Sequence, residues 1–142
     1  MENDTLLTCL RQRVILMTGI LDLTKQMEVQ SKQNIPQMDD LLRQRQACMD
    51  RIDKCNALIQ KEAASLQLDG YASLPHLLAG DAEQAVSDED FEICSLVQTN
   101  RELLHSTITI DANAVQRIQE QKEFMRGKVN NLRFARSSPK PQ

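Results

Sequence analysis

The fold is decided by residues 38–68, which read MDDLLRQRQACMDRIDKCNALIQKEAASLQL. Mostly apolar side chains recur here at alternating steps of three and four over four heptads, which is typical of a coiled-coil helix and not of a strand. The seam positions are Met38, Leu41, Arg45, Cys48, Ile52, Cys55, Ile59, Glu62 and Leu66. A charged side chain in such a seam, as at Arg45 and Glu62, reaches out to solvent, pairs with an opposite charge or contacts a partner. The stretch predicts one long amphipathic helix that packs along other helices.

A similar stripe precedes this helix, within residues 4–33. Its apolar positions are Leu6, Leu7, Leu10, Val14, Met17, Ile20, Leu21, Thr24 and Met27. Residues 34–36 separate the two stripes, because Pro36 cannot continue a helix from the preceding turn but fits the first turn of the next one. The sequence therefore predicts a first helix of about 30 residues joined to the second by a short connection.

The periodicity disappears between residues 67 and 86. Gly70, Pro75 and Gly80 punctuate this segment, and seven acidic residues without any Lys or Arg lie between residues 69 and 92. Such a pattern is typical of a loop, and loops of about 20 residues are commonly functional or mobile. We expect an acidic loop with a short helical piece at Leu74–Leu78.

A third helix is predicted from Ser87 to about residue 136. Ser87 is a hydroxyl cap followed by the acidic residues 88–90, which is a strong signal for a helix start. The three-and-four spacing then continues to Leu132, with one extra residue inserted around residues 104–108. The β-branched run at residues 107–110 lies between helical spacings on both sides, so a helix is favoured over a strand.

Together these segments predict an all-α antiparallel bundle of three long coiled-coil-like helices, with one long acidic loop between the second and third. Residues 1–136 form a single domain in this interpretation, and residues 137–142 form a disordered tail. The first two helices should span roughly 45 Å each and the third nearly 70 Å, at the rise of an α-helix. Some 20–25 Å of the third helix, at its C-terminal end, should therefore lack a partner within the chain.

That C-terminal part carries the predicted partner-binding site. Seven basic residues and only two acidic ones lie between residues 117 and 140. An apolar stripe with a basic rim is typical of a helix that binds another helix. The predicted site comprises Ile118, Lys122, Phe124, Met125, Arg126, Lys128, Val129, Leu132 and Arg133. The alternative is that these residues complete an intramolecular or homodimer core.

Composition argues against several other functions. Twenty Asp and Glu against 17 Lys and Arg give a net charge of −3, which is too balanced for a protein that binds nucleic acid over its whole surface. No phosphate-binding glycine motif, zinc-protease motif or calcium-loop motif is present, and neither His76 nor His105 has a readable catalytic neighbour in the sequence. We expect no catalytic residue, no metal site and no cofactor.

The compartment is predicted from the N-terminus and the cysteines. The chain starts with acidic residues, and its longest uncharged apolar stretch, Val14–Leu21, is far shorter than a membrane-spanning helix. The four cysteines form no C-x-x-C pair, which favours small core residues over redox or zinc chemistry. A cytoplasmic protein without membrane insertion is expected.

Three short stretches resemble a known family. Residues 41–46 (LLRQRQ) with residues 49–53 (MDRID), residues 20–26 (ILDLTKQ) and residues 110–113 (IDAN) are similar to segments of the FlgN/FliT-like flagellar export chaperones. The resemblance implies a non-enzymatic cytosolic chaperone of flagellar type III secretion. It also implies that the C-terminal helix binds the amphipathic C-terminal helix of a hook–filament junction protein and delivers it to a component of the export apparatus. The alternative is a structural coiled-coil module for dimerisation or scaffolding without an export substrate, and a homodimer is compatible with both.

Overall fold

The computed structural model describes residues 4–32 and 38–137, and every regular element in these ranges is helical. The elements are α1 (Asp4–Gln30), α2 (Met38–Leu68), α3 (Leu74–Leu78), the 3₁₀ turn η1 (Ala82–Gln84) and α4 (Asp88–Ser137). Beyond residue 113, the residues with described side chains are Gln116, Arg117, Gln119, Glu120, Glu123, Phe124, Arg126 and Gly127. The all-helical prediction is confirmed for this part of the chain. The predicted tail began at Ser137, which is the last residue of α4, and its residues 138–142 lie outside the described residues, as does the predicted break at residues 34–36.

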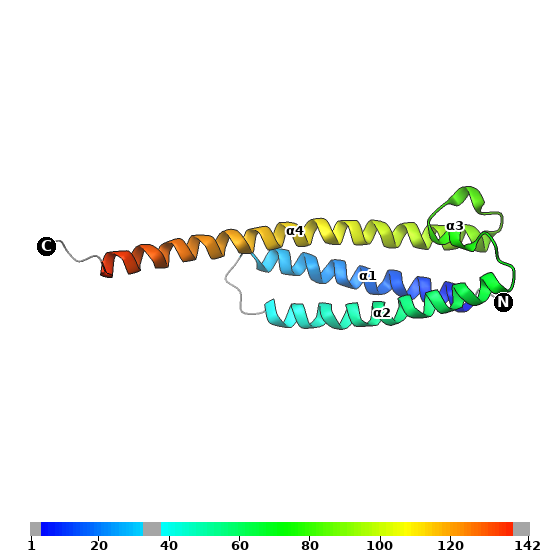
Figure 1. The fold of residues 1–142 in the computed structure, drawn as a ribbon, viewed down its shortest axis with the longest axis horizontal. Coiled ribbons are helices and arrows are strands. Elements are labelled where there is room, and N and C mark those ends of the chain that lie inside the picture. Colours follow the sequence, from blue (N-terminus) through cyan, green and yellow to red (C-terminus); the bar gives the residue numbers. More distant parts are fainter. Residues whose placement is uncertain (1–3, 33–37, 138–142) are drawn as a thin grey trace.

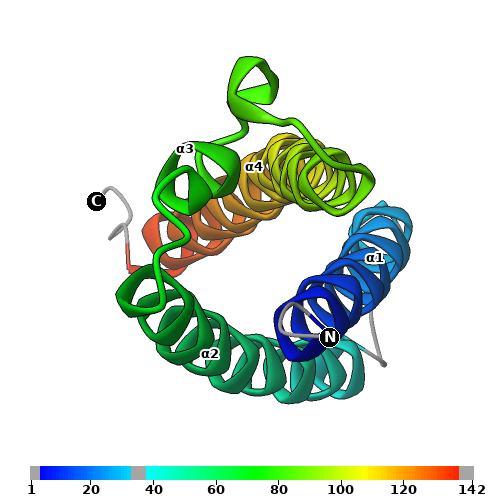
Figure 2. The ribbon, with the colours of Figure 1, turned by 90° about the vertical axis from the view of Figure 1, so that its right-hand side faces the viewer.

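Helix α1 is the central element of the molecule. It runs antiparallel to α2 and parallel to α4, and it packs against both along its own length (Figure 1). The backbones of α2 and α4 do not pack directly on each other anywhere in the described ranges. Seen along the long axis, α2 and α4 flank α1 and face each other on the side away from it (Figure 2). Two of the three helix pairs are therefore closely packed, and the third is open.

Two short turns fix the position of α3. After α2, Gly70 has φ of +102°, and the backbone N–H groups of Gly70 and Tyr71 donate to the carbonyl oxygens of Gln67 and Leu66. The same pattern ends α3, where Gly80 has φ of +86° and donates to Leu77. Glycine adopts this left-handed conformation without steric cost, so each helix stops with its last carbonyl groups satisfied.

The start of α4 is fixed by a reciprocal cap. The backbone N–H of Asp90 donates to Ser87 Oγ at 3.1 Å, and Asp90 Oδ2 accepts from the backbone N–H of Val86 at 3.0 Å and of Ser87 at 3.4 Å. The hydroxyl of Tyr71 donates to the other oxygen of Asp90. Burial alone would raise the pKa of Asp90, but these hydrogen bonds lower it. The helix start predicted at Ser87 is confirmed.

The buried core divides into two clusters. The larger one lies where α3 covers the end of the bundle and is built by Leu6, Leu7, Cys9, Leu10, Ile59, Ala63, Leu66, Leu74, Leu77, Ile93, Cys94 and Val97. The smaller one, at the other end of α1, is built by Leu23, Met27 and Leu41. The two clusters enclose the ends of the bundle and leave the middle of α2 and α4 between them.

Candidate functional site

An apolar groove lies between the two core clusters, on the side where α2 and α4 face each other. Its volume is about 290 Å³, and all three long helices contribute to it. The lining residues are Met17, Ile20, Arg45, Met49, Ile52, Asp53, Leu104, Thr107, Ile108 and Asp111. The groove is therefore the place where the open helix pair leaves apolar side chains without a covering helix.

The floor and the walls of the groove differ in exposure. On the floor, Met17 and Ile20 of α1 are 5% and 4% exposed. On the walls, Met49 of α2 is 44% exposed, and Leu104 and Ile108 of α4 are 44% and 58% exposed. Large apolar side chains that line a shared depression are typical of a surface that binds another protein.

Arg45 ties the three helices together at one end of this groove. Its Nη1 donates to Asp111 Oδ1 of α4 at 2.7 Å and to Thr24 Oγ1 of α1 at 3.3 Å. Its side chain is only 17% exposed. Of the three roles expected for a charge in the α2 seam, the structure shows pairing with an opposite charge.

Nearer the start of α4, the space between α2 and α4 is occupied by α3. Leu74 and Leu77 are fully buried between α2 and α4, and the thiol of Cys94 donates to the carbonyl oxygen of Leu77 at 3.7 Å. A short helix with leucines three residues apart therefore fills the space between α2 and α4 at this end. The groove lies farther along α2 and α4, where no residue of α3 lines it.

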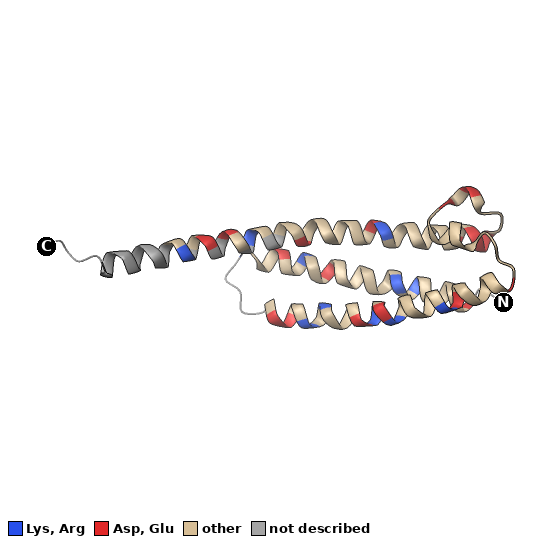
Figure 3. Ribbon diagram, in the orientation of Figure 1, with Lys and Arg blue, Asp and Glu red and all other residues tan. Residues whose placement is uncertain are grey.

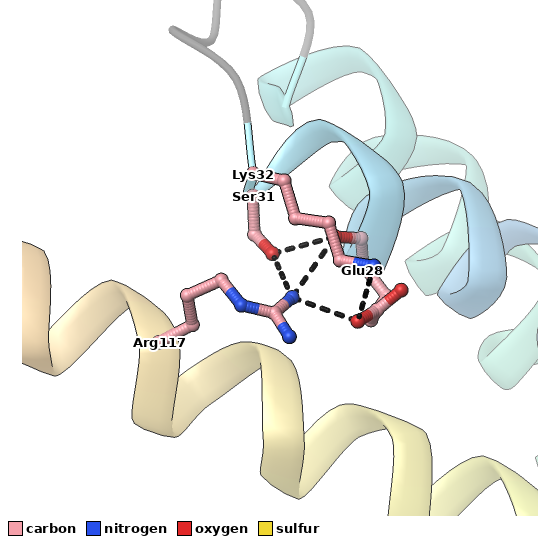
Figure 4. A network of polar contacts seen from close by, with 4 residues as sticks. All are labelled: Glu28, Ser31, Lys32 and Arg117. Atoms are coloured by element: carbon pink, nitrogen blue, oxygen red, sulfur yellow. Dashed lines mark hydrogen bonds and ion pairs between the residues drawn. The ribbon is translucent and has the colours of Figure 1, made fainter.

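Helix α4 continues past the other helices beyond Arg117 (Figure 1). Arg117 Nη1 lies 2.7 Å from Glu28 Oε1 and 3.1 Å from Ser31 Oγ, in the last turn of α1 and just after it (Figure 4). The hydrogen bond from Arg117 lowers the pKa of Glu28, and Lys32 adds to this effect at 3.6 Å. Twenty further residues of α4, roughly 30 Å of helix, extend beyond this contact. We call residues 118–137 the α4 projection.

The site predicted from the sequence lies on this projection. Phe124 is 67% exposed, and Arg126 is also exposed. The side chains of Ile118, Lys122, Met125, Lys128, Val129, Leu132 and Arg133 lie outside the described residues. The groove residues were missed by sequence reasoning, although two signals pointed to them. Met49 widened the apolar stripe of α2, and the extra residue interrupted the spacing of α4 at 104–108, where Leu104 and Ile108 line the groove.

The histidines and the buried cysteines among the described residues lie outside the groove. His76 and His105 are exposed and lie on separate helices. Cys9 and Cys94 are buried, and burial raises the pKa of both thiols, so they stay protonated and unreactive. Over residues 4–32 and 38–137, His, Cys, Asp and Glu nowhere form a group of three or more that could hold a metal ion. None of the described helices combines the length and apolarity that crossing a membrane requires.

No protein-family model, no curated protein and no solved structure matches this chain.

Proposed function

We propose that this chain is a non-catalytic protein that binds an amphipathic helix of a partner in the groove between α2 and α4. One observation carries the proposal, namely that α3 fills the space between α2 and α4 at one end while the same space is open along the groove. A bound helix with apolar residues three and four positions apart would cover Met49, Leu104 and Ile108 as α3 covers its own neighbours.

The chemistry of the groove favours a helix over a small molecule. Seven of the ten lining residues are apolar or Thr, and the charged ones are Arg45, Asp53 and Asp111. Arg45 and Asp111 already neutralise each other, which leaves Asp53 as a polar contact at the rim. Such a surface offers few directional hydrogen bonds, so the apolar area would supply most of the binding free energy.

We further propose that the partner is an export substrate, and that the chain is a cytoplasmic flagellar export chaperone. Support comes from the resemblance to FlgN/FliT-like chaperones, because the stretches that carry it contribute to the groove. Residues 49–53 include Met49, Ile52 and Asp53, and residues 110–113 include Asp111. The proposed client is the amphipathic C-terminal helix of a hook–filament junction protein, which the chaperone hands to the export apparatus.

The finer architecture belongs to the same proposal. We regard α1, α2 and α4 as an antiparallel bundle of three coiled-coil-like helices in one domain, with the acidic segment between α2 and α4 as its connection. Acidic residues gather at that end of the molecule, around η1 and the first turn of α4 (Figure 3). The α4 projection, with its predicted residues Met125, Val129 and Leu132, would extend the client-binding surface beyond the groove.

The test is a titration of the full chain with peptides of the C-terminal helices of hook–filament junction proteins from the same genome, followed by calorimetry. Met49→Asp and Ile108→Asp place a charge in the groove and should each weaken binding at least tenfold. Ile15→Asp is the matched control, because Ile15 is 63% exposed and does not line the groove. Equal affinity in the groove variants and the control would exclude the groove as the binding site. Absence of binding by the wild-type chain would favour the alternative, a coiled-coil scaffold.

A further inference from the structure

A layer of three polar side chains crosses the bundle between the groove and the larger core cluster. They are Arg13 of α1, Asn56 of α2 and Asn100 of α4, which we call the Arg13 layer. Nη1 of Arg13 donates to Asn56 Oδ1 at 3.1 Å. Each member of the layer lies four residues, about one helical turn, from a residue of its own helix that lines the groove, namely Met17, Ile52 and Leu104. The groove therefore has a polar boundary on the side of α3.

A second polar layer bounds the groove at its other end. In this layer the guanidinium of Arg45 donates to the carboxylate of Asp111 and to the hydroxyl of Thr24. On each of the three long helices the two layers lie eleven residues apart, which is roughly 16 Å of helix. On α4 the residue of the Arg13 layer that corresponds to Asp111 is Asn100, so an amide stands there in place of a carboxylate.

Arg13 forms no ion pair with any of the described residues. Its Nε is buried without a hydrogen-bond partner, and so is Asn100 Oδ1. Burial lowers the pKa of Arg13, and the influence that opposes this comes from the thiol of Cys55 and not from an acidic side chain. Asp53, three residues from Asn56 on α2, is exposed and does not pair with Arg13. A guanidinium that is partly removed from water without a carboxylate costs free energy, so the layer is incomplete as it stands.

We propose that the helix bound in the groove supplies a carboxylate that pairs with Arg13. This inference deepens the proposed function and rests on it, because it names the chemistry of the client at one position. The backbones of α2 and α4 do not pack on each other, and Arg13, Asn56 and Asn100 are each half-buried, so the layer is not sealed from the side on which a client would lie. A carboxylate accepts two N–H bonds from a guanidinium, and such a pair is stronger in a partly buried site than on an open surface.

The spacing of the two layers predicts the pattern of the client. Between the layers the client needs an apolar stripe of about three helical turns, because the groove between them is apolar. Just beyond the end of the stripe that lies nearer α3, the client needs a carboxylate. The other end needs no charge, since Arg45 is already paired with Asp111. The side chain of Asp or Glu and the terminal carboxylate of a chain that ends there have the same chemistry.

The first experiment tests the need for a carboxylate without any client. Asn100→Asp places a carboxylate in the Arg13 layer at the position that corresponds to Asp111, and should raise the midpoint of urea denaturation of the full chain. In an Arg13→Met background the same change should lower the midpoint, because the carboxylate is then buried without a partner. Arg13→Gln, which keeps a polar side chain, repeats the comparison. Asp53→Asn is the matched control and should leave both effects of Asn100→Asp unchanged, since Asp53 is exposed. An equal effect of Asn100→Asp with and without Arg13 would overturn the proposal.

The second experiment measures the binding of synthetic amphipathic helices by calorimetry. The peptides carry leucines at three-and-four spacing over about three turns, have amidated C-termini, and differ only in a Glu or a Gln just beyond one end or the other of the stripe. Wild type should bind one of the two Glu peptides about tenfold more tightly than its Gln counterpart. Arg13→Met and Asn100→Asp should each remove this preference and keep the affinity for the Gln peptide, whereas Asp53→Asn should keep the preference.

A third set of peptides distinguishes the two sources of the carboxylate. In these peptides the chain ends just beyond the stripe with a free terminal carboxylate or with an amide, and a preference of wild type for the free carboxylate that Arg13→Met removes would assign the site to a chain terminus. Equal affinity of wild type for all charged and uncharged peptides would overturn this inference and leave the proposed function intact. Absence of binding by every peptide, including the natural ones, would overturn the proposed function and this inference with it.

Discussion

The two ends of the space between α2 and α4 differ in whether a helix lies in it. At the α3 end, Leu74 and Leu77 are fully buried, together with Ile93. Along the groove, the same two helices leave Met49 and Ile108 about half exposed. Helices α2 and α4 both pack on α1 but not on each other, so the apolar side chains that face the space between them stay exposed. A further apolar helix is needed in that space to bury them. The chain supplies that helix for one end of the space and not for the other.

The largest expected difference between the two regions is in folding stability. Leu77→Ala should lower the free energy of unfolding by about 2–5 kcal/mol, because it opens a cavity in a fully enclosed site. Ile108→Ala should lower it by less than about 1 kcal/mol, since more than half of that side chain is already in water. Urea denaturation followed by circular dichroism measures both. Similar losses for the two variants would show that Ile108 is as well covered as Leu77 and would contradict an open groove.

A smaller effect is expected for the cap that holds α3 and α4 together, and it depends on pH. The pKa of Asp90 is lowered in the folded protein, so its contribution to stability is present above its unfolded pKa of about 3.9 and is lost as the pH falls through the folded value. Asp90→Asn should therefore cost about 1–3 kcal/mol at neutral pH, where it replaces a hydrogen-bonded charge, and less at acid pH. Denaturation curves at pH 7 and pH 3 give the two values. A loss that is the same at both pH values would contradict the role of the ionised carboxylate.

Tyr71→Phe is the complementary change at this cap. It removes one of the hydrogen bonds that lower the pKa of Asp90 and keeps the ring. The pH at which acid unfolding occurs should rise slightly in this variant, since a less stabilised carboxylate is protonated earlier. If Tyr71→Phe leaves the acid transition unchanged, the lowered pKa of Asp90 is due to the backbone N–H groups of Val86 and Ser87 instead.

The smallest effect is expected at the opposite end of the molecule, where Arg117 attaches α4 to α1. Arg117→Gln removes the ion pair with Glu28 and should leave global stability almost unchanged, because partly exposed ion pairs contribute little. Amide hydrogen exchange should nevertheless become faster in the last turns of α1 and in α4 around residue 117. Exchange that accelerates equally in α3 would show a global effect and contradict the local role.

The sequence was sufficient to predict the elements of the fold. The seam of α2, the cap at Ser87 and the helical piece at Leu74–Leu78 are all local signals, and the structure has a helix or a helix start at each of them. Periodicity shows how much of a helix is apolar, but not how many neighbours it has. The sequence therefore did not predict that α1 is central, with buried residues such as Leu16 and Leu23 beside the predicted stripe.

The candidate site was harder to predict, because periodicity does not show which helices surround an apolar stripe. A groove is a property of three helices at once, and its residues Ile20, Met49 and Ile108 appear in the sequence as ordinary members of apolar stripes. Because α2 and α4 pack on α1 and not on each other, Met49 and Ile108 stay about half exposed, whereas Ile20 is buried. The overhang of α4, in contrast, follows from counting residues and was expected from helix lengths alone, although the side chains of most of its predicted site lie outside the described residues.

The central place of α1 also has a consequence for synthesis of the protein. Helix α1 leaves the ribosome before α2 and α4, and the surface it offers to α4 stays uncovered until α4 has been made. The hairpin of α1 and α2 can form early from contacts near in sequence, whereas docking of α4 requires closure over the whole chain length. A nascent chain that stalls before residue 88 would thus expose half of the α1 core, and such intermediates are prone to aggregate.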